Sequence, residues 1–310
     1  MDMNSTLPPA VTLQEVALRD GLQNEQTILT VEQKVWLVNA LADCGLARIE
    51  VSSFVNPKVV PQMADAEEIW ERMDRVEGVL YSALILDENG LNRAIRSAVP
   101  HVGIWVSASE THSKENSNKT IGESLNHALD LIERAKDAGM CVRAGVMCAF
   151  GCAYEGDVPV DRVAGVVRSM KAAGPDEISL ADTAGMANPL QIDSTVRTVN
   201  DGIDGLPLSL HLHNTRGLGM VNVYAAILRG VTIFDSSLGG IGGCPFIKNA
   251  SGNIATEDMT HMLKSIGIET GVDLERLVAV SLRFEEMLGK KLPAAITNLY
   301  GTTSWMSPVN

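Results

Sequence analysis

Short apolar runs alternate with longer amphipathic stretches along nearly the whole chain. A run of four to eight apolar residues is typical of a buried strand, whereas apolar residues that recur every three or four positions are typical of a helix. On this basis we predict eight strands, at residues 11–18, 47–52, 79–86, 101–108, 142–149, 177–181, 208–213 and 231–237. Each strand precedes a predicted helix, at residues 31–43, 64–73, 89–98, 121–138, 159–173, 189–200, 221–229 and 256–266.

Glycines follow four of these predicted helices, at Gly45, Gly139, Gly174 and Gly230. A glycine just beyond the last turn is typical of a helix end, because it adopts a left-handed conformation without steric cost. Strands that alternate with helices predict a parallel α/β sheet, and eight such units favour closure into a TIM barrel. A doubly wound open sheet is the alternative.

We therefore expect a single (β/α)8 TIM-barrel domain over residues 1–310. The barrel should cover about residues 11–270, and an extra C-terminal helix and tail should cover 271–310. Residues 298–310 are expected to be loosely structured, as chain ends often are.

Composition narrows the possible partners. The formal net charge of −13 argues against nucleic acid and anionic membrane surfaces, which repel an acidic protein, but it allows a local basic pocket for an anionic substrate. No apolar run approaches the ~20 residues of a membrane span, and residues 1–10 lack the features of a targeting peptide. Five cysteines, an odd number without a second metal-binding pair, predict reduced thiols in a cytoplasmic protein rather than disulfides or structural zinc.

The strongest chemical clue is the pair His211 and His213 at the end of a predicted strand. Side chains two residues apart on a strand share a face, and their Cα atoms lie about 6.6 Å apart, so two imidazoles can bind one metal ion. The same pair could instead be polar residues that face solvent or a layer of the core. The other strand ends decide between these interpretations, because a TIM barrel carries its active residues there.

Those strand ends are rich in side chains that bind ions or carry charge. They hold Arg19, Asp20, Glu50, Asp182 and Thr183, and Asn253 precedes the last predicted barrel helix. Any single Asp or Asn is well explained as a helix cap, but the whole set on one rim favours a site. We predict a divalent metal site, because oxygen donors combined with imidazoles suit Mg²⁺ or Mn²⁺ better than zinc. The predicted ligands are Asp20, His211, His213 and Asn253.

Two further features complete this hypothesis. Arg19 would stabilise negative charge on a carbonyl oxygen, and Glu50 would hold its guanidinium in a bidentate pair. The glycine-rich residues 239–243 match neither the dinucleotide nor the P-loop spacing. They suit a mobile lid that carries Cys244 over the site, although a free cysteine is equally often a small buried hydrophobe.

At these residues the chain resembles a known family. Residues 16–25, Val-Ala-Leu-Arg-Asp-Gly-Leu-Gln-Asn-Glu, resemble the opening motif of the 3-hydroxy-3-methylglutaryl-CoA lyases. Residues 239–246 and 250–258 are similar to their signature loop and the helix behind it, and residues 61–65 and 148–156 also match. The resemblance extends over about residues 11–290. It implies a metal-dependent TIM barrel that cleaves or forms a C–C bond beside a thioester or a keto acid.

The resemblance also implies roles for individual residues. Asp20, His211, His213 and Asn253 would be metal ligands, and Arg19, held by Glu50, would be the electrophilic stabiliser. Cys244 would take part in proton transfer and Asp182 would line the site. The predicted substrate contacts are Arg19, Gln23, Thr183 and Arg216. The implied reaction is a retro-Claisen cleavage of an acyl-CoA thioester to acetyl-CoA and a keto acid, as in leucine degradation, by a homodimer or a larger homo-oligomer.

Two departures leave the acyl group open. The family commonly has Asp-Thr-Tyr-Gly after the second histidine, where this chain has Asn-Thr-Arg-Gly at residues 214–217. A lysine is also common where this chain has Gln26. (R)-Citramalyl-CoA or another 3-hydroxyacyl-CoA is therefore an alternative substrate.

Two other functions are alternatives to cleavage. A Claisen synthase of the isopropylmalate or citramalate type resembles the chain at Arg-Asp-Gly and His-x-His, but it usually carries a C-terminal regulatory domain, and only a short stretch follows Leu288. A non-catalytic CoA-binding scaffold is disfavoured, because all four predicted ligands, Arg19 and Cys244 are present.

Overall fold

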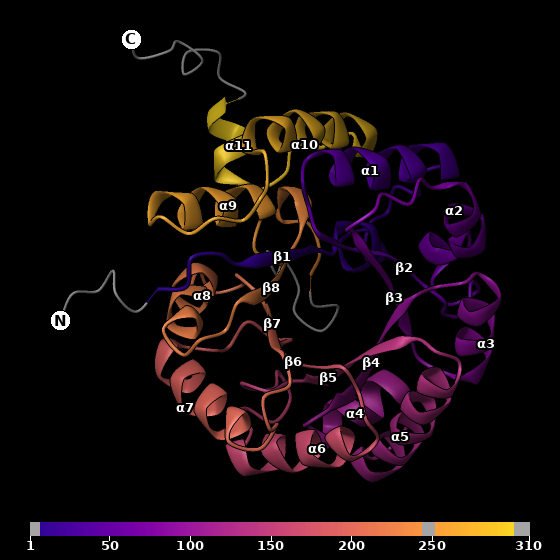
Figure 1. Cartoon of the computed structure of the whole chain (residues 1–310), viewed down its shortest axis with the longest axis vertical. Helices are drawn as coiled ribbons and strands as arrows, with labels where there is room; N and C mark the ends of the chain where they lie inside the picture. The colour runs from indigo at the N-terminus through magenta and orange to yellow at the C-terminus, as the bar shows by residue number, and fades with distance from the viewer. Residues whose placement is uncertain (1–6, 244–251, 301–310) are drawn as a thin grey trace.

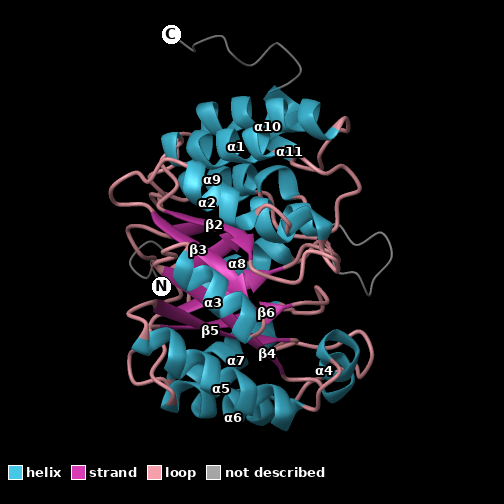
Figure 2. Ribbon diagram, turned by 90° about the vertical axis from the view of Figure 1, so that its right-hand side faces the viewer, coloured by secondary structure: helices cyan, strands magenta, loops and turns pink. Residues whose placement is uncertain are grey.

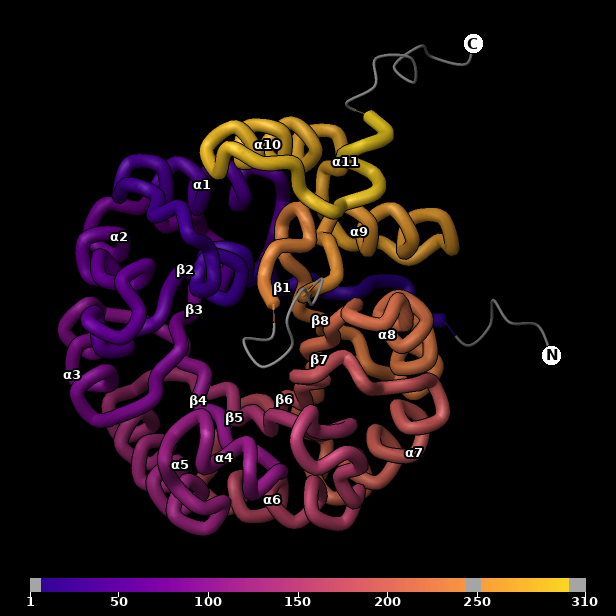
Figure 3. Tube along the Cα trace, turned by 180° about the vertical axis from the view of Figure 1, so that it is seen from behind, coloured from indigo at the N-terminus to yellow at the C-terminus, as the bar shows by residue number. Residues whose placement is uncertain are grey.

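Eight parallel strands form a closed barrel in sequence order, surrounded by helices (Figure 1). The computed structural model describes residues 7–243 and 252–300. The strands are β1 Thr12–Glu15, β2 Arg48–Ser53, β3 Leu80–Ile85, β4 His101–Ser107, β5 Cys141–Met147, β6 Glu177–Asp182, β7 Leu208–Leu212 and β8 Ile233–Ser236. β1 pairs with β8 although they lie far apart in the sequence (Figure 3), so the predicted TIM barrel is confirmed and the open sheet is excluded.

The eight predicted barrel helices are all present. They are α1 Val31–Asp43, α2 Ala66–Arg72, α3 Glu88–Arg96, α5 Ile121–Asp137, α6 Val160–Ala172, α7 Pro189–Asn200, α8 Gly219–Ile227 and α9 Thr256–Ser265. Capping boxes at Thr30, Thr120 and Asn188 begin α1, α5 and α7, because each side chain accepts an N–H that the first turn leaves unpaired. The four helix-end glycines have φ between 78° and 87°, as predicted.

The described residues contain three further α-helices: α4 Glu110–Ser117, α10 Leu274–Leu288 and α11 Ala295–Tyr300. α10 and α11 lie beside α1 and α9 on one flank of the barrel (Figures 1 and 2). We did not predict α4, whose polar sequence lacks a clear apolar stripe. Residues 298–300, expected to be loosely structured, instead belong to α11, and the rest of the expected tail lies outside the described residues. Among the described residues no helix is both long and apolar enough to cross a membrane.

The prediction of a strand over residues 11–18 is wrong at its C-terminal half. β1 ends at Glu15, and Ala17–Gly21 form a π-helical turn. The Glu15 carboxylate accepts the Ala17 N–H at 2.8 Å, and the backbone N–H groups of Arg19 and Asp20 donate back to the Val16 carbonyl. The chain therefore curls at the barrel rim, and a single tight turn carries both Arg19 and Asp20. Such π-turns are frequent at functional sites.

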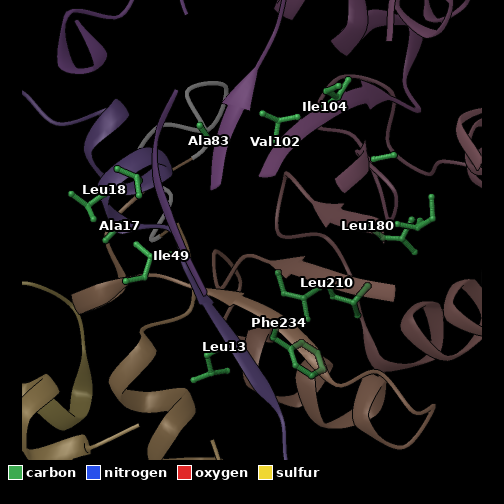
Figure 4. Close-up of a cluster of buried hydrophobic side chains, with 14 of the residues drawn as sticks. Leu13, Ala17, Leu18, Ile49, Ala83, Val102, Ile104, Leu180, Leu210 and Phe234 are labelled. Carbon is green, nitrogen blue, oxygen red and sulfur yellow. The ribbon is translucent and has the colours of Figure 1, made fainter. Parts of the chain in front are cut away.

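The strands divide their side chains between an apolar outer face and a polar interior. Buried apolar residues on alternate strand positions pack toward the helices, among them Leu13, Ile49, Ala83, Val102, Ile104, Leu180, Leu210 and Phe234 (Figure 4). The interior instead holds ion pairs, where many TIM barrels have branched apolar residues. Arg143 on β5 binds Glu177 on β6 at 3.0 Å and, across the barrel, Asp235 on β8 at 2.8 Å. The charged interior was not predicted.

Candidate metal and substrate site

Three potential metal ligands meet at the rim formed by the carboxyl ends of the strands. One ligand atom from each of Asp20, His211 and His213 lies within 4.8 Å of the others. β7 ends between the two histidines, and their Nε2 atoms are 3.0 Å apart. Donors about 2.1 Å from an octahedral ion are about 3.0 Å apart at neighbouring vertices. The donor set therefore fits a divalent cation without rearrangement of the histidines.

The protonation states also suit an ion. Burial, followed by the nearby His211, lowers the pKa of His213 to about 4, so this imidazole is neutral at neutral pH. Burial alone would raise the pKa of Asp20, but Arg19 and the two histidines outweigh it and the pKa is lowered. Metal binding requires neutral imidazole and ionised carboxylate, and the structure favours both.

A buried carboxylate orients His211. The imidazole Nδ1 lies 3.0 Å from Asp235, whose other oxygen accepts a hydrogen bond from Arg143. Burial would raise the pKa of Asp235, but Arg143 and His211 lower it well below the ordinary value. This contact holds the proton on Nδ1 and leaves Nε2 free to face His213. The sequence pattern did not predict the roles of Asp235 and Arg143. The available signal was a single charged residue within each of two otherwise apolar strands.

Asn253 lies beside this group. Its Nδ2 donates to Asp20 at 2.6 Å and to the Ile241 carbonyl at 3.1 Å, and its backbone forms a bridge with His213. To act as a fourth ligand the amide must present its oxygen, which a half-turn about the last side-chain bond supplies. The structure thus brings all four predicted ligands together, and the role of Asn253 stays a prediction.

Arg19 is a buried cation next to Asp20. Its Nε donates to Glu50 at 2.5 Å and its Nη1 donates to Asp20 at 2.6 Å. The predicted bidentate pair with Glu50 is wrong, because Nη1 turns toward Asp20 instead. Burial would lower the pKa of Arg19, but the two carboxylates raise it above the ordinary value, so the charge is permanent. Within the described part of the chain Nη2 has no hydrogen-bond partner, and Arg19 lines a cavity.

The cavity has a volume of about 340 Å³ and opens over these residues. Gln23 and Thr183, both predicted to bind substrate, line it, and Thr183 also accepts the Cys148 N–H at 2.9 Å. Its apolar lining residues are Val55, Val59, Val60, Leu84, Leu86, Trp105 and Met147. The cavity thus combines charged, ligand-bearing side chains with apolar ones, which is the usual character of a small-molecule site.

Asp182 and Arg216, both predicted site residues, lie outside the cavity lining and support a loop. Asp182 is fully buried and accepts the N–H groups of Met186 and Ala187, and burial raises its pKa to about 6. Arg216 donates from Nη1 to the carbonyls of Ala184 and Gly185, at 2.6 and 2.9 Å. Both residues therefore brace the loop that follows Thr183. Their direct chemical roles stay predictions, and Cys244 lies outside the described residues.

Comparisons with known proteins identify the family of this chain. The profile of the HMGL-like family matches residues 10–282. The chain is 40% identical to hydroxymethylglutaryl-CoA lyase YngG of Bacillus subtilis, over 93% of this chain and 96% of the relative. It is 40% identical to the 3-hydroxy-3-isohexenylglutaryl-CoA/hydroxymethylglutaryl-CoA lyase of Pseudomonas aeruginosa, over 92% and 95%. An HMG-CoA lyase from Acinetobacter baumannii, solved with coenzyme A and 3-methylmalate, superposes with a TM-score of 0.91 at 36% identity and covers 100% of both chains.

Proposed function

Because this chain belongs to the HMGL-like family, we propose that it is a carbon–carbon lyase that cleaves 3-hydroxy-3-methylglutaryl-CoA, or a close analogue, to acetyl-CoA and a keto acid. The observation that carries this proposal is the convergence of Asp20, His211 and His213 beside the Arg19 cation in one cavity. The names of the relatives and the coenzyme A complex of one of them support the substrate class.

A divalent metal, Mg²⁺ or Mn²⁺, is part of the proposal. Asp20, His211, His213 and Asn253 would hold it, for the geometric and protonation reasons given above. When bound, such an ion acts as a Lewis acid that lowers the pKa of an alcohol and withdraws negative charge from oxygen.

The protein side chains account for the remaining chemistry. The C3 hydroxyl loses its proton, the C2–C3 bond breaks, and the bond's electron pair moves into the thioester as an enolate, leaving a keto group at C3. Arg19, whose Nη2 has no partner among the described residues, is placed to stabilise the enolate oxygen, and Glu50 and Asp20 fix its guanidinium. C2 then takes up a proton, for which Cys244 remains the proposed donor.

The experiment is acetyl-CoA release from a panel of 3-hydroxyacyl-CoA thioesters, with Mg²⁺ or Mn²⁺ added. We expect cleavage of 3-hydroxy-3-methylglutaryl-CoA, loss of at least about 100-fold in rate after chelation, and recovery when metal returns. Full activity in chelator-stripped protein would refute the metal role. Faster cleavage of (R)-citramalyl-CoA than of 3-hydroxy-3-methylglutaryl-CoA would identify (R)-citramalyl-CoA as the preferred substrate.

Two outcomes would replace the proposal. Condensation of acetyl-CoA onto a keto acid, without cleavage of any thioester, would identify a synthase. Binding of coenzyme A with neither reaction would identify a non-catalytic scaffold. Homo-oligomeric assembly, a cytoplasmic location and a place in leucine degradation belong to the same proposal, supported by the family resemblance and the composition.

A further inference from the structure

Glu15, the last residue of β1, is fully buried and joins three segments of the chain through its carboxylate. Its Oε1 accepts the backbone N–H of Ala17 and that of Leu238, both at 2.8 Å. Its Oε2 accepts the Thr256 hydroxyl at 2.6 Å. A single side chain on β1 is therefore bonded to the turn that follows it and to two segments more than 200 residues away in the sequence.

Two of these hydrogen bonds lie at the starts of turns beside the metal site. Ala17 is the first residue of the π-turn that contains Asp20. Leu238 is the first residue of a 3-10 turn, Leu238–Gly240, directly before Ile241. Because both N–H groups donate to the same oxygen, the starting points of the two turns are fixed relative to each other.

The two turns pack closely together beside two of the predicted ligands. A Cβ added at Gly21, the last residue of the π-turn, would lie 2.5 Å from the Ile241 side chain, so the glycine allows Ile241 to contact this turn directly. The Ile241 carbonyl accepts the Asn253 amide at 3.1 Å, and the same amide donates to Asp20 at 2.6 Å. Asn253 is thus held by the segment after the second turn, whereas Asp20 belongs to the first.

Thr256 provides a second connection to Asn253, which precedes it by three residues. Its backbone N–H donates to the Ser237 carbonyl at 3.1 Å, next to Leu238. Its hydroxyl lies between Glu15 and the Ser236 hydroxyl, at 2.6 and 2.9 Å. Each oxygen of Glu15 is therefore connected to a predicted ligand through a short stretch of backbone.

We propose that Glu15 is a positioning residue of the metal site, which fixes Asp20 and Asn253 at the spacing that one divalent cation needs by holding both turns at one oxygen. The inference rests on the metal part of the proposed function, and it gives Glu15 no contact with the metal or the substrate. The role depends on hydrogen-bond geometry rather than on charge. A protonated carboxyl still accepts both N–H groups at its carbonyl oxygen and donates from the other oxygen to Thr256.

The test measures Mn²⁺ binding directly, from the electron paramagnetic resonance signal of free Mn²⁺, in native protein and in variants whose folding is checked by circular dichroism. Glu15→Ala should raise the Kd for Mn²⁺ by about 10- to 100-fold, because loss of a group that orients metal ligands typically costs that much affinity. Glu15→Gln should bind Mn²⁺ as native protein does. Its amide oxygen can accept the two N–H groups, and its NH₂ group can donate to Thr256.

Asp176 provides a matched control at the opposite end of the barrel. It directly precedes β6 and, like Glu15, accepts a backbone N–H of another segment, that of Val142 at 2.7 Å. It also binds Lys136 at 2.7 Å. Asp176→Ala should lower the melting temperature but leave the Kd for Mn²⁺ unchanged. If Glu15 only stabilised the fold, the two alanine variants would have the same Mn²⁺ affinity.

Three results would overturn the inference. They are an unchanged Mn²⁺ affinity in folded Glu15→Ala, a loss in Glu15→Gln as large as in Glu15→Ala, and an equal loss in Asp176→Ala. If Glu15→Ala does not fold, Glu15→Asp takes its place, because its shorter side chain cannot hold both turns at their native spacing and should also weaken Mn²⁺ binding.

Failure of the proposed function would give a different result. Native protein that binds Mn²⁺ but cleaves no thioester would refute the lyase function, while the Mn²⁺ affinities of the Glu15 variants would still decide the role of Glu15. Native protein that binds no Mn²⁺ would refute the metal site and overturn this inference with it.

Discussion

Two buried arginines, Arg143 in the barrel interior and Arg19 at its rim, form similar ion pairs but have different roles. Each contacts two carboxylates. Arg143 also donates to the hydroxyls of Ser179 and Ser209, so its charge is neutralised inside the protein. Arg19 lines the cavity and keeps Nη2 without a partner among the described residues. Arg143 does not line the cavity and stabilises structure, whereas a cation that faces a cavity can act on a substrate.

The largest effect that separates the two arginines is on stability. Arg143→Met should lower the free energy of unfolding by about 3–5 kcal/mol, because it removes the arginine partner of the buried Asp235 and leaves Glu177 paired with Arg48 alone. Denaturant unfolding followed by circular dichroism measures the change. Ser179→Ala removes one hydroxyl contact without uncovering a charge and serves as the control, with an expected loss of only about 1 kcal/mol. A loss this small in Arg143→Met would contradict the structural role.

Arg19→Met should act mainly on turnover. We expect kcat to fall by about 100- to 1,000-fold, since removal of one preorganised donor to a developing oxyanion typically costs that much. Arg19→Lys keeps the charge but not the planar fork, so it should recover only part of the rate. Steady-state kinetics on folded, metal-loaded protein measures both. Unchanged turnover in Arg19→Met would refute the role of Arg19 in stabilising the enolate. Equal losses of kcat in Arg19→Met and Arg143→Met would contradict the distinction between a catalytic Arg19 and a structural Arg143.

The smallest effect concerns acid stability. Burial, and then the Arg48 charge, lower the pKa of His101 in the barrel interior to about 4 from an ordinary value of 6.5. Between these two values the unfolded chain binds a proton that the folded protein refuses, so stability rises with pH and is lost as pH falls from 6.5 toward 4 and below. His213 contributes with the same sign in metal-free protein. His101→Gln should therefore flatten the pH dependence of unfolding, and an unchanged slope would contradict it.

Local sequence patterns predicted most of the fold and part of the site. Apolar runs, amphipathic periods and helix-end glycines depend only on residues a few positions apart. The strands and barrel helices were therefore predicted with small errors at their ends. His211 and His213 were predicted as a pair because a strand alone places them on one face.

The features that the sequence did not predict all depend on contacts between segments that are distant in the sequence. The turn at Ala17–Gly21 depends on Glu15, whose carboxylate also accepts the N–H of Leu238, which follows the neighbouring strand β8 but is far away in the sequence. The contact between Asp235 and His211 needs β7 and β8 as neighbours. Trp105 and Gly145 are 40 residues apart, and only the β4–β5 register shows that one fills the space the other leaves.

The sequence by itself determined that this chain forms alternating strands and helices, and that acids, imidazoles and an arginine follow its strands, because both depend on residue type and short-range spacing. Only the tertiary structure decided which charges are enclosed in the barrel interior and which face a cavity. It also decided that Arg19 turns to Asp20 and that the Trp105 indole fills the space beside Gly145. Those properties depend on burial and on the distances between segments, which closure of the barrel creates.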